Sequence, residues 1–165
     1  MKRVLIIGCP GSGKSTFARA LHQATGLPLY HLDMMYWNAD KTTVPKDVFL
    51  RRLQDVLDQS EWILDGNYAS TMELRLQHAD TVFFLDLPTE LCLEGIHARR
   101  GLARPDMPWI EDDDVDEKFL SFVKQYRTES RPRVLDLLSE YSNCNTVIFR
   151  SHAEIDAYLQ ALVKP

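Results

Sequence analysis

A glycine-rich turn that carries a lysine and a serine stands near the start of the sequence. Residues 8–15, GCPGSGKS, follow the apolar run RVLII and satisfy the pattern G-x-x-x-x-G-K-[ST]. Glycines let the backbone curl so that successive N–H groups point at phosphate oxygens, and the positive end of the following helix faces the same point. An ordinary strand-to-helix turn would not explain the Lys-Ser pair. The segment is therefore predicted to be a phosphate-binding loop, or P-loop.

The side chains of the P-loop have separate predicted tasks. Lys14 is expected to be catalytic and to reach the β- and γ-phosphates of a nucleotide. The Ser15 hydroxyl is expected to bind a magnesium ion that bridges these phosphates. The residues predicted to contact the nucleotide are Gly8, Pro10, Gly11, Ser12, Gly13, Lys14, Ser15 and Thr16.

Aspartates end three later apolar runs, and each could serve this site. Asp65 ends WILD before a glycine, which leaves backbone room beside a metal ion. Asp86 ends FFLD before Leu-Pro and could simply end a strand or cap a helix, so we favour Asp65 as the second magnesium ligand, with Asp86 as the alternative. Asp33 ends PLYHLD and could orient a phosphoryl acceptor as a catalytic residue, because open α/β sheets bind ligands at the carboxyl ends of their strands. A turn aspartate that satisfies local N–H groups is an equal alternative for Asp33.

Arginines are the remaining polar candidates. Arg99 and Arg104 are predicted to be catalytic and Arg100 to contact the nucleotide, because the guanidinium fork suits phosphate oxygens. The alternative for Arg99 and Arg100 is a solvated helix face. Weaker candidates are Arg75, for an anionic group of the acceptor, and Arg131 and Arg133, which flank Pro132 where a further helix is expected to begin. Four ring side chains could face the acceptor, although packing is the more frequent role of each: His31, Tyr36, Trp37 and Tyr68.

Five short apolar runs must position these side chains. They span 3–8, 28–33, 62–65, 81–86 and 145–149, and they are nearly continuous in apolar residues, as in strands covered on both faces. Helical periodicity separates them. We expect an α/β fold, a five-stranded parallel sheet flanked by helices with right-handed crossovers. The stripes expected to face the core are Phe17, Leu21 and Ala24; Phe49, Leu53 and Val56; and Phe119, Phe122, Val123 and Tyr126.

Length and composition favour one domain spanning 1–165. The chain has 165 residues, 45% of them apolar, and a formal net charge of −5, so direct nucleic-acid binding is not expected. No apolar run approaches the roughly 20 residues that a membrane crossing needs, and the initial run is too short for a signal peptide, so a cytoplasmic location is expected. The three cysteines lack metal-site spacing and are expected to be reduced.

The segment 101–117, GLARPDMPWIEDDDVDE, is predicted to be a mobile loop because it holds two prolines and a run of acids. The acids include Asp112, Asp113 and Asp114, which lack the spacing of an EF-hand. They are therefore expected to form a solvated loop and helix cap, not a metal cage.

Several segments carry a resemblance to known families. GCPGSGKST, EWILDGNYAS and the arginines of HARRGLARPD resemble the adenylate-kinase-type P-loop kinases. HLDMMYW, WILDGNY, LRLQHADTVFFLDLP and RPDM, in this order, resemble more closely the topology modulation (FlaR-related) proteins, over most of the chain. The resemblance aligns Asp65 with the aspartate of the adenylate-kinase motif. Asn67 and Tyr68 stand where adenylate kinases have Phe-Pro-Arg, a departure that argues against adenosine monophosphate as the acceptor.

The resemblance implies a parallel sheet in the order 2-3-1-4-5, with ATP and Mg²⁺ as cofactors. It also implies an acceptor-binding segment at about 34–60 and a lid at about 101–117. The expected function is an ATP- and Mg²⁺-dependent phosphotransferase for a nucleotide, nucleoside or similar small acceptor, working as a monomer or homodimer without a membrane. Two alternatives stay open: a nucleotide-responsive regulator that transfers nothing, and a scaffold that binds no nucleotide.

Overall fold

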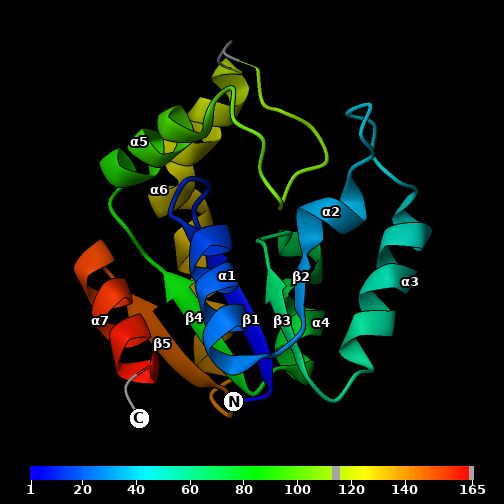
Figure 1. Cartoon of the computed structure of the whole chain (residues 1–165), viewed down its shortest axis with the longest axis vertical. Helices are drawn as coiled ribbons and strands as arrows, with labels where there is room; N and C mark the ends of the chain where they lie inside the picture. Colours follow the sequence, from blue (N-terminus) through cyan, green and yellow to red (C-terminus); the bar gives the residue numbers. More distant parts are fainter. Residues whose placement is uncertain (113–115, 164–165) are drawn as a thin grey trace.

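Five parallel strands form one sheet at the centre of the molecule (Figure 1). The computed structural model describes residues 1–112 and 116–163. The strands are β1 (Arg3–Gly8), β2 (Leu29–His31), β3 (Trp62–Asp65), β4 (Thr81–Leu85) and β5 (Asn145–Phe149), and their spatial order is β2-β3-β1-β4-β5. The predicted parallel sheet and its order are therefore confirmed.

Helices cover both faces of the sheet, which explains the continuous apolar runs. Successive residues of β1 point to opposite faces: Val4 and Ile6 pack with helices α1 (Lys14–Thr25) and α7 (His152–Val163). Leu5 and Ile7 pack with α3 (Lys46–Leu57), α4 (Ala69–His78) and α6 (Glu117–Glu140) on the other face. Helix α5 (Thr89–Arg99) packs on α6 beside the P-loop. Within the described residues, no helix combines the length and the apolar character that a membrane crossing requires.

Two expected element boundaries differ from the structure. Strand β2 ends at His31, and a short helix α2 (Leu32–Tyr36) begins with the fully buried Leu32, so Asp33 lies in a first helical turn and not at a strand end. Helix α6 runs without a break through Pro132, where a new helix was expected. Buried side chains on either side of the proline, such as Val123 and Val134, hold both halves of α6 against the rest of the molecule.

The expected helical stripes are largely buried, with two exceptions. Ala24 is exposed in the last turn of α1, and Ala18 completes the stripe of Phe17 and Leu21. Phe122 is 46% exposed, and it borders a cavity described below.

The P-loop touches helix α5 backbone to backbone. A side chain at Gly11, which has φ +80°, would begin 2.0 Å from the carbonyl oxygen of Cys92. A side chain at Gly95 of α5 would begin 2.1 Å from the carbonyl oxygen of Gly11. Since carbon atoms cannot approach oxygen so closely, both positions need glycine while the loop keeps this shape.

We expect Gly95→Ala to push the P-loop away from α5. The crowding should cost about 1–3 kcal/mol of unfolding free energy and weaken the binding of a nonhydrolysable ATP analogue. Gly26→Ala is the matched control, because Gly26 has φ +73° but open space around it at the far end of α1. Thermal unfolding and titration with the analogue should give Gly26→Ala a lower stability with unchanged affinity. Equal affinities of the two variants would contradict the proposed contact.

Candidate nucleotide and acceptor site

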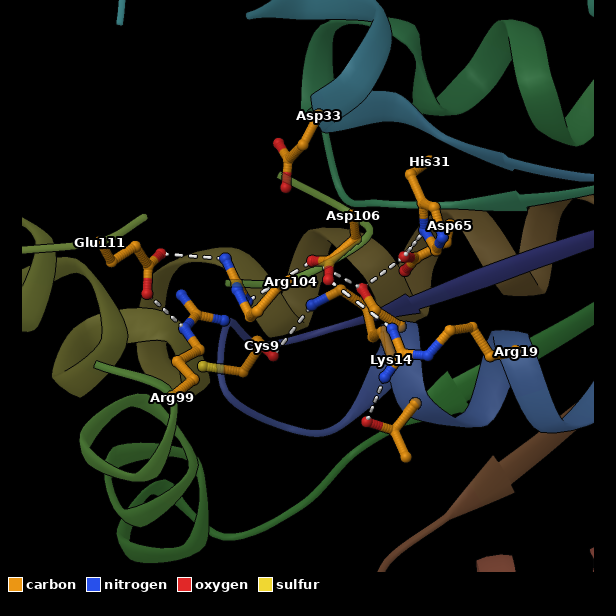
Figure 2. A network of polar contacts seen from close by, with 12 residues as sticks. Cys9, Lys14, Arg19, His31, Asp33, Asp65, Arg99, Arg104, Asp106 and Glu111 are labelled. Atoms are coloured by element: carbon orange, nitrogen blue, oxygen red, sulfur yellow. Dashed lines mark hydrogen bonds and ion pairs between the residues drawn. The ribbon is translucent and has the colours of Figure 1, made fainter. Parts of the chain in front are cut away.

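Polar side chains from five segments converge on the P-loop at the carboxyl edge of the sheet (Figure 2). Gly13 precedes α1 with φ +92°, and no side chain caps the helix. The N–H groups of the first turn are therefore open to an anion, which the helix dipole also favours. The segments contribute Lys14 and Arg19 from α1, His31 and Asp33 around the end of β2, Asp65 from β3, Arg99 from α5, and Arg104, Asp106 and Glu111 from the loop after it.

Lys14 lies folded over the loop that carries it. Its Nζ donates a hydrogen bond to the carbonyl oxygen of Cys9 at 3.1 Å. Removal from water lowers the pKa of Lys14, and the nearby carboxylate of Asp65 opposes this effect. The ammonium group is therefore partly removed from water, and in this position its attraction for phosphate oxygens would be stronger than in bulk solvent.

Ser15 and Asp65 form a direct contact between the P-loop and β3. The Ser15 hydroxyl donates to Oδ2 of Asp65 at 2.6 Å, and Nδ1 of His31 lies 2.7 Å from the same oxygen. Asp65 is 4% exposed, and its Oδ1 has no hydrogen-bond partner among the described residues. A buried, unpartnered carboxylate oxygen beside a hydroxyl fits a hard cation such as Mg²⁺, which prefers oxygen ligands.

Asp86, the alternative metal ligand, is occupied by arginines. Nε and Nη2 of Arg131 donate to its two oxygens at 2.7 and 2.8 Å, and Nη1 of Arg127 lies 3.5 Å away. This bidentate pair raises the pKa of Arg131 and holds α6 to the end of β4. The contacts of Asp86 and Arg131 are therefore those of a structural ion pair.

The P-loop lies between two cavities. The larger, of about 460 Å³, has polar walls that include Lys14, Ser15, Asp33 and Asp65. Apolar side chains of α4 and α6 also line it: Met72, Phe122, Tyr126, Val134 and Leu137. The smaller, of about 380 Å³, is lined by the outer side of the P-loop and by Thr16, Arg19, Arg99, Arg104 and His152. Lys14 and Ser15 line both cavities.

Asp33 faces the larger cavity and accepts a hydrogen bond from the hydroxyl of Tyr68. Burial raises the pKa of Asp33, the Tyr68 hydrogen bond opposes this rise, and the charge of Asp65 adds to it. Tyr36 and Trp37 pack edge to face with centroids 5.1 Å apart, as the packing alternative for these rings anticipated.

Two of the three expected lid arginines reach the cavities. Nε of Arg99 and Nη2 of Arg104 each lie 3.0 Å from Glu111, and Nη1 of Arg104 lies 3.4 Å from Asp106. Arg100 is not among the described residues that line either cavity, and it lies just past the end of α5 with an extended backbone. The two carboxylates, Asp106 and Glu111, both belong to the loop that follows α5.

That loop also contacts the segment after β2. The rings of Trp37 and Trp109 meet edge to face at 5.1 Å, and Nζ of Lys41 lies 2.7 Å from Asp112. In Figure 1 the chain after α5 accordingly runs above the carboxyl edge of the sheet toward α2. Asp113 and Asp114 of the expected acidic loop lie outside the described residues.

Arg75 is not where the sequence led us to expect it. It is fully buried, and its guanidinium donates to the carbonyl oxygens of Thr71, Gly66, Asn67 and Tyr68. Desolvation lowers its pKa to about 9, so it stays charged at neutral pH. Its donors fix the turn after β3, and Arg75 is not among the described residues that line the larger cavity.

Asp106, Glu111, Arg19 and Asn67 are site residues that the sequence analysis missed. Asn67 accepts from the N–H of Gly8 at 3.0 Å and donates to its carbonyl, so it ties the turn after β3 to the start of the P-loop. Its place directly after Asp65-Gly66 was the available signal. For Asp106 and Glu111 the signal was weak, because acids in a proline-rich loop are usually solvated.

The contacts of Asp65 and Asp86 predict opposite outcomes for their amides. Asp86→Asn should lower the free energy of unfolding by about 2–3 kcal/mol, because it leaves Arg131 and Arg127 without their buried partner. Asp65→Asn should weaken the Mg²⁺-dependent binding of an ATP analogue by about tenfold or more, with a smaller change in stability. Urea unfolding and analogue titrations with and without Mg²⁺ measure both effects. The reverse ranking would transfer the metal role to Asp86.

No protein-family model matches the chain, and no curated protein matches its sequence. Among solved structures, the crystal structure of shikimate kinase from Bacteroides thetaiotaomicron is similar, with a TM-score of 0.61 and 17% sequence identity. The similarity covers 98% of this chain and 95% of that one. At this identity the similarity concerns the fold alone: the chain has the fold of a P-loop kinase.

Proposed function

We propose that this protein is an ATP- and Mg²⁺-dependent phosphotransferase for a small acceptor, such as a nucleotide, nucleoside or metabolite of similar size. The observation that carries the proposal is the arrangement of two cavities on either side of the P-loop, with Lys14 and Ser15 in the walls of both. A donor nucleotide in the smaller cavity and an acceptor in the larger one would meet at these side chains. We propose one domain over 1–165 with a lid at about 101–117. The acceptor-binding segment expected at about 34–60 contributes no residue to the described lining of the larger cavity, whose lining on that side begins with Asp33.

Each polar group has a role in this proposal. Lys14, Arg99 and Arg104 bind the phosphates of ATP and offset the charge that builds on the transferred group. Ser15 and Asp65 would hold Mg²⁺, which would supply positive charge to offset that of the phosphates. Asp33 orients the acceptor hydroxyl and takes its proton while the acceptor oxygen bonds to the γ-phosphorus. The bond from that phosphorus to the β-γ bridging oxygen breaks, and ADP leaves.

The walls of the larger cavity favour an acceptor with an apolar face. Met72, Val134 and Leu137 line one side, and Arg133 also borders the cavity. Arg133 is a candidate partner for one anionic group, whereas Arg75 is committed to backbone carbonyls. This arrangement supports an acceptor that carries a hydroxyl group and little negative charge over one that carries a phosphate.

We expect ATP turnover to rise sharply with one member of a panel of nucleosides, nucleotides and hydroxy acids. Asp33→Asn should reduce this stimulated turnover by about 10², the usual scale for a positioned acid or base, with little change in affinity for an ATP analogue. Asp47→Asn is the control, because Asp47 is exposed on α3 and its described ion pair is with Arg51. Slow turnover that no acceptor stimulates would favour the regulator, and no nucleotide binding at all would favour the scaffold.

The hydrogen bond from Tyr68 to Asp33 predicts a shift in the pH profile. It stabilises the carboxylate, so Tyr68→Phe should raise the pKa of Asp33 further. Transfer needs the carboxylate and is lost as the pH falls through this pKa. The acid limb of kcat/KM should therefore move to higher pH by about 0.5–1 unit.

Tyr36→Phe is the matched control for this profile. The Tyr36 ring lies 5.0 Å from that of Tyr68, but no hydrogen bond joins it to Asp33 among the described contacts. An unmoved acid limb in Tyr68→Phe would exclude Asp33 as the base.

A further inference from the structure

A carboxylate from the loop after α5 reaches the P-loop serine. Oδ2 of Asp106 lies 3.1 Å from the Ser15 hydroxyl, and Figure 2 shows Asp106 between Arg104 and the P-loop. Asp106 is 3% exposed and belongs to the walls of both cavities. It is therefore as deeply enclosed as Asp65, although it comes from a surface loop.

Two carboxylates thus converge on one hydroxyl. Ser15 has a single proton, which the shorter contact of 2.6 Å gives to Asp65, so it cannot donate to Asp106 at the same time. The other partners of Asp106 are arginines at longer distances: Arg104 at 3.4 Å and Arg19 at 3.7 Å. Asp106 accordingly keeps capacity to bind a cation on the side that faces Ser15.

We infer that Asp106 is a third protein ligand of the Mg²⁺ ion, so that the lid itself completes the metal site. The inference rests on the proposed function and adds to it a ligand outside the P-loop and β3. Side chains from three segments meet at the Ser15 hydroxyl: Oδ2 of Asp65 and Oδ2 of Asp106 both lie within hydrogen-bond distance of it. The other carboxylate oxygen of Asp65, Oδ1, has no hydrogen-bond partner among the described residues. Mg²⁺ takes one or two carboxylates together with phosphate oxygens and water, which this set allows.

The charges around the site support a role for Asp106 as a cation ligand over a role as a stand-in for a phosphate. Arg99 and Arg104 are proposed to bind the triphosphate, and they already share their charge with Glu111 and Asp106, while Arg19 also lies near Asp106. An additional carboxylate there would repel the phosphates unless a divalent ion lay between them. The rival role is a plug, in which Asp106 occupies the place of a phosphate and leaves when ATP binds.

The experiment measures the affinity for Mn²⁺ of the protein saturated with a nonhydrolysable ATP analogue. Electron paramagnetic resonance detects the bound Mn²⁺. Asp106→Asn should weaken this affinity by about tenfold or more. Asp112→Asn is the matched control, since it removes another carboxylate of the same loop, one that pairs with Lys41 instead of facing Ser15. It should stay within about twofold of the wild type, because it lies outside the metal site.

The outcomes separate the claims. Unchanged or tighter Mn²⁺ binding in Asp106→Asn would overturn the inference and favour the plug. Absence of protein-bound Mn²⁺ in the wild type would instead overturn the proposed function. If Asp106→Asn lowers the melting temperature too far for titration, hydrogen exchange of the wild type decides. At saturating analogue, Mg²⁺ should slow exchange over 101–112 relative to a chelator, and equal exchange rates would overturn the inference.

Discussion

Carboxylates taken out of water need partners, and this requirement organises the carboxyl edge of the sheet. Asp65 is held by Ser15 and His31, and Asp86 by arginines of α6. Each pairing joins segments that are distant in the sequence: the P-loop to β3, and β4 to α6. The positions of the cavities follow from these pairings, because the paired residues fix the P-loop and α6 relative to the strand ends. Stability and site geometry thus depend on the same contacts.

The loop after α5, which we propose to be a lid, differs from the rest of the edge in how its charges are balanced. Glu111 binds Arg99 and Arg104 within one stretch of chain, so this segment carries its own counterions when it lies over the P-loop. Because these charges are paired with one another, the segment can move away from the P-loop without leaving a buried charge there unpaired. On the α2 side, the Lys41–Asp112 ion pair lies at the surface, where such pairs contribute little, and the rings of Trp37 and Trp109 are partly buried.

The sequence was informative where the physical signal is local. Continuous apolar runs identify strands covered on both faces, and the P-loop pattern needs its glycines and lysine within eight residues, so the sheet and the phosphate site could be predicted. Pro132 looked like a helix start because a proline costs a hydrogen bond, but the packing of Val123 and Val134 outweighs that cost. For Arg75 and Asp106 the local signal was weak or misleading. Their roles come from partners brought near only by the folded chain.

The contact between Gly11 and Gly95 has an evolutionary consequence. A β-carbon at Gly11 would collide with the backbone of α5, and a β-carbon at Gly95 would collide with the backbone of the P-loop. Neither position can therefore gain a side chain while the P-loop and α5 stay where they are. Substitutions at the two positions are therefore not independent, although a loop and a helix far apart in the sequence carry them. Descendants of this chain would have to keep both glycines or move α5 and the P-loop apart together. Sequence drift in the P-loop is thus limited by a helix that carries none of its motif.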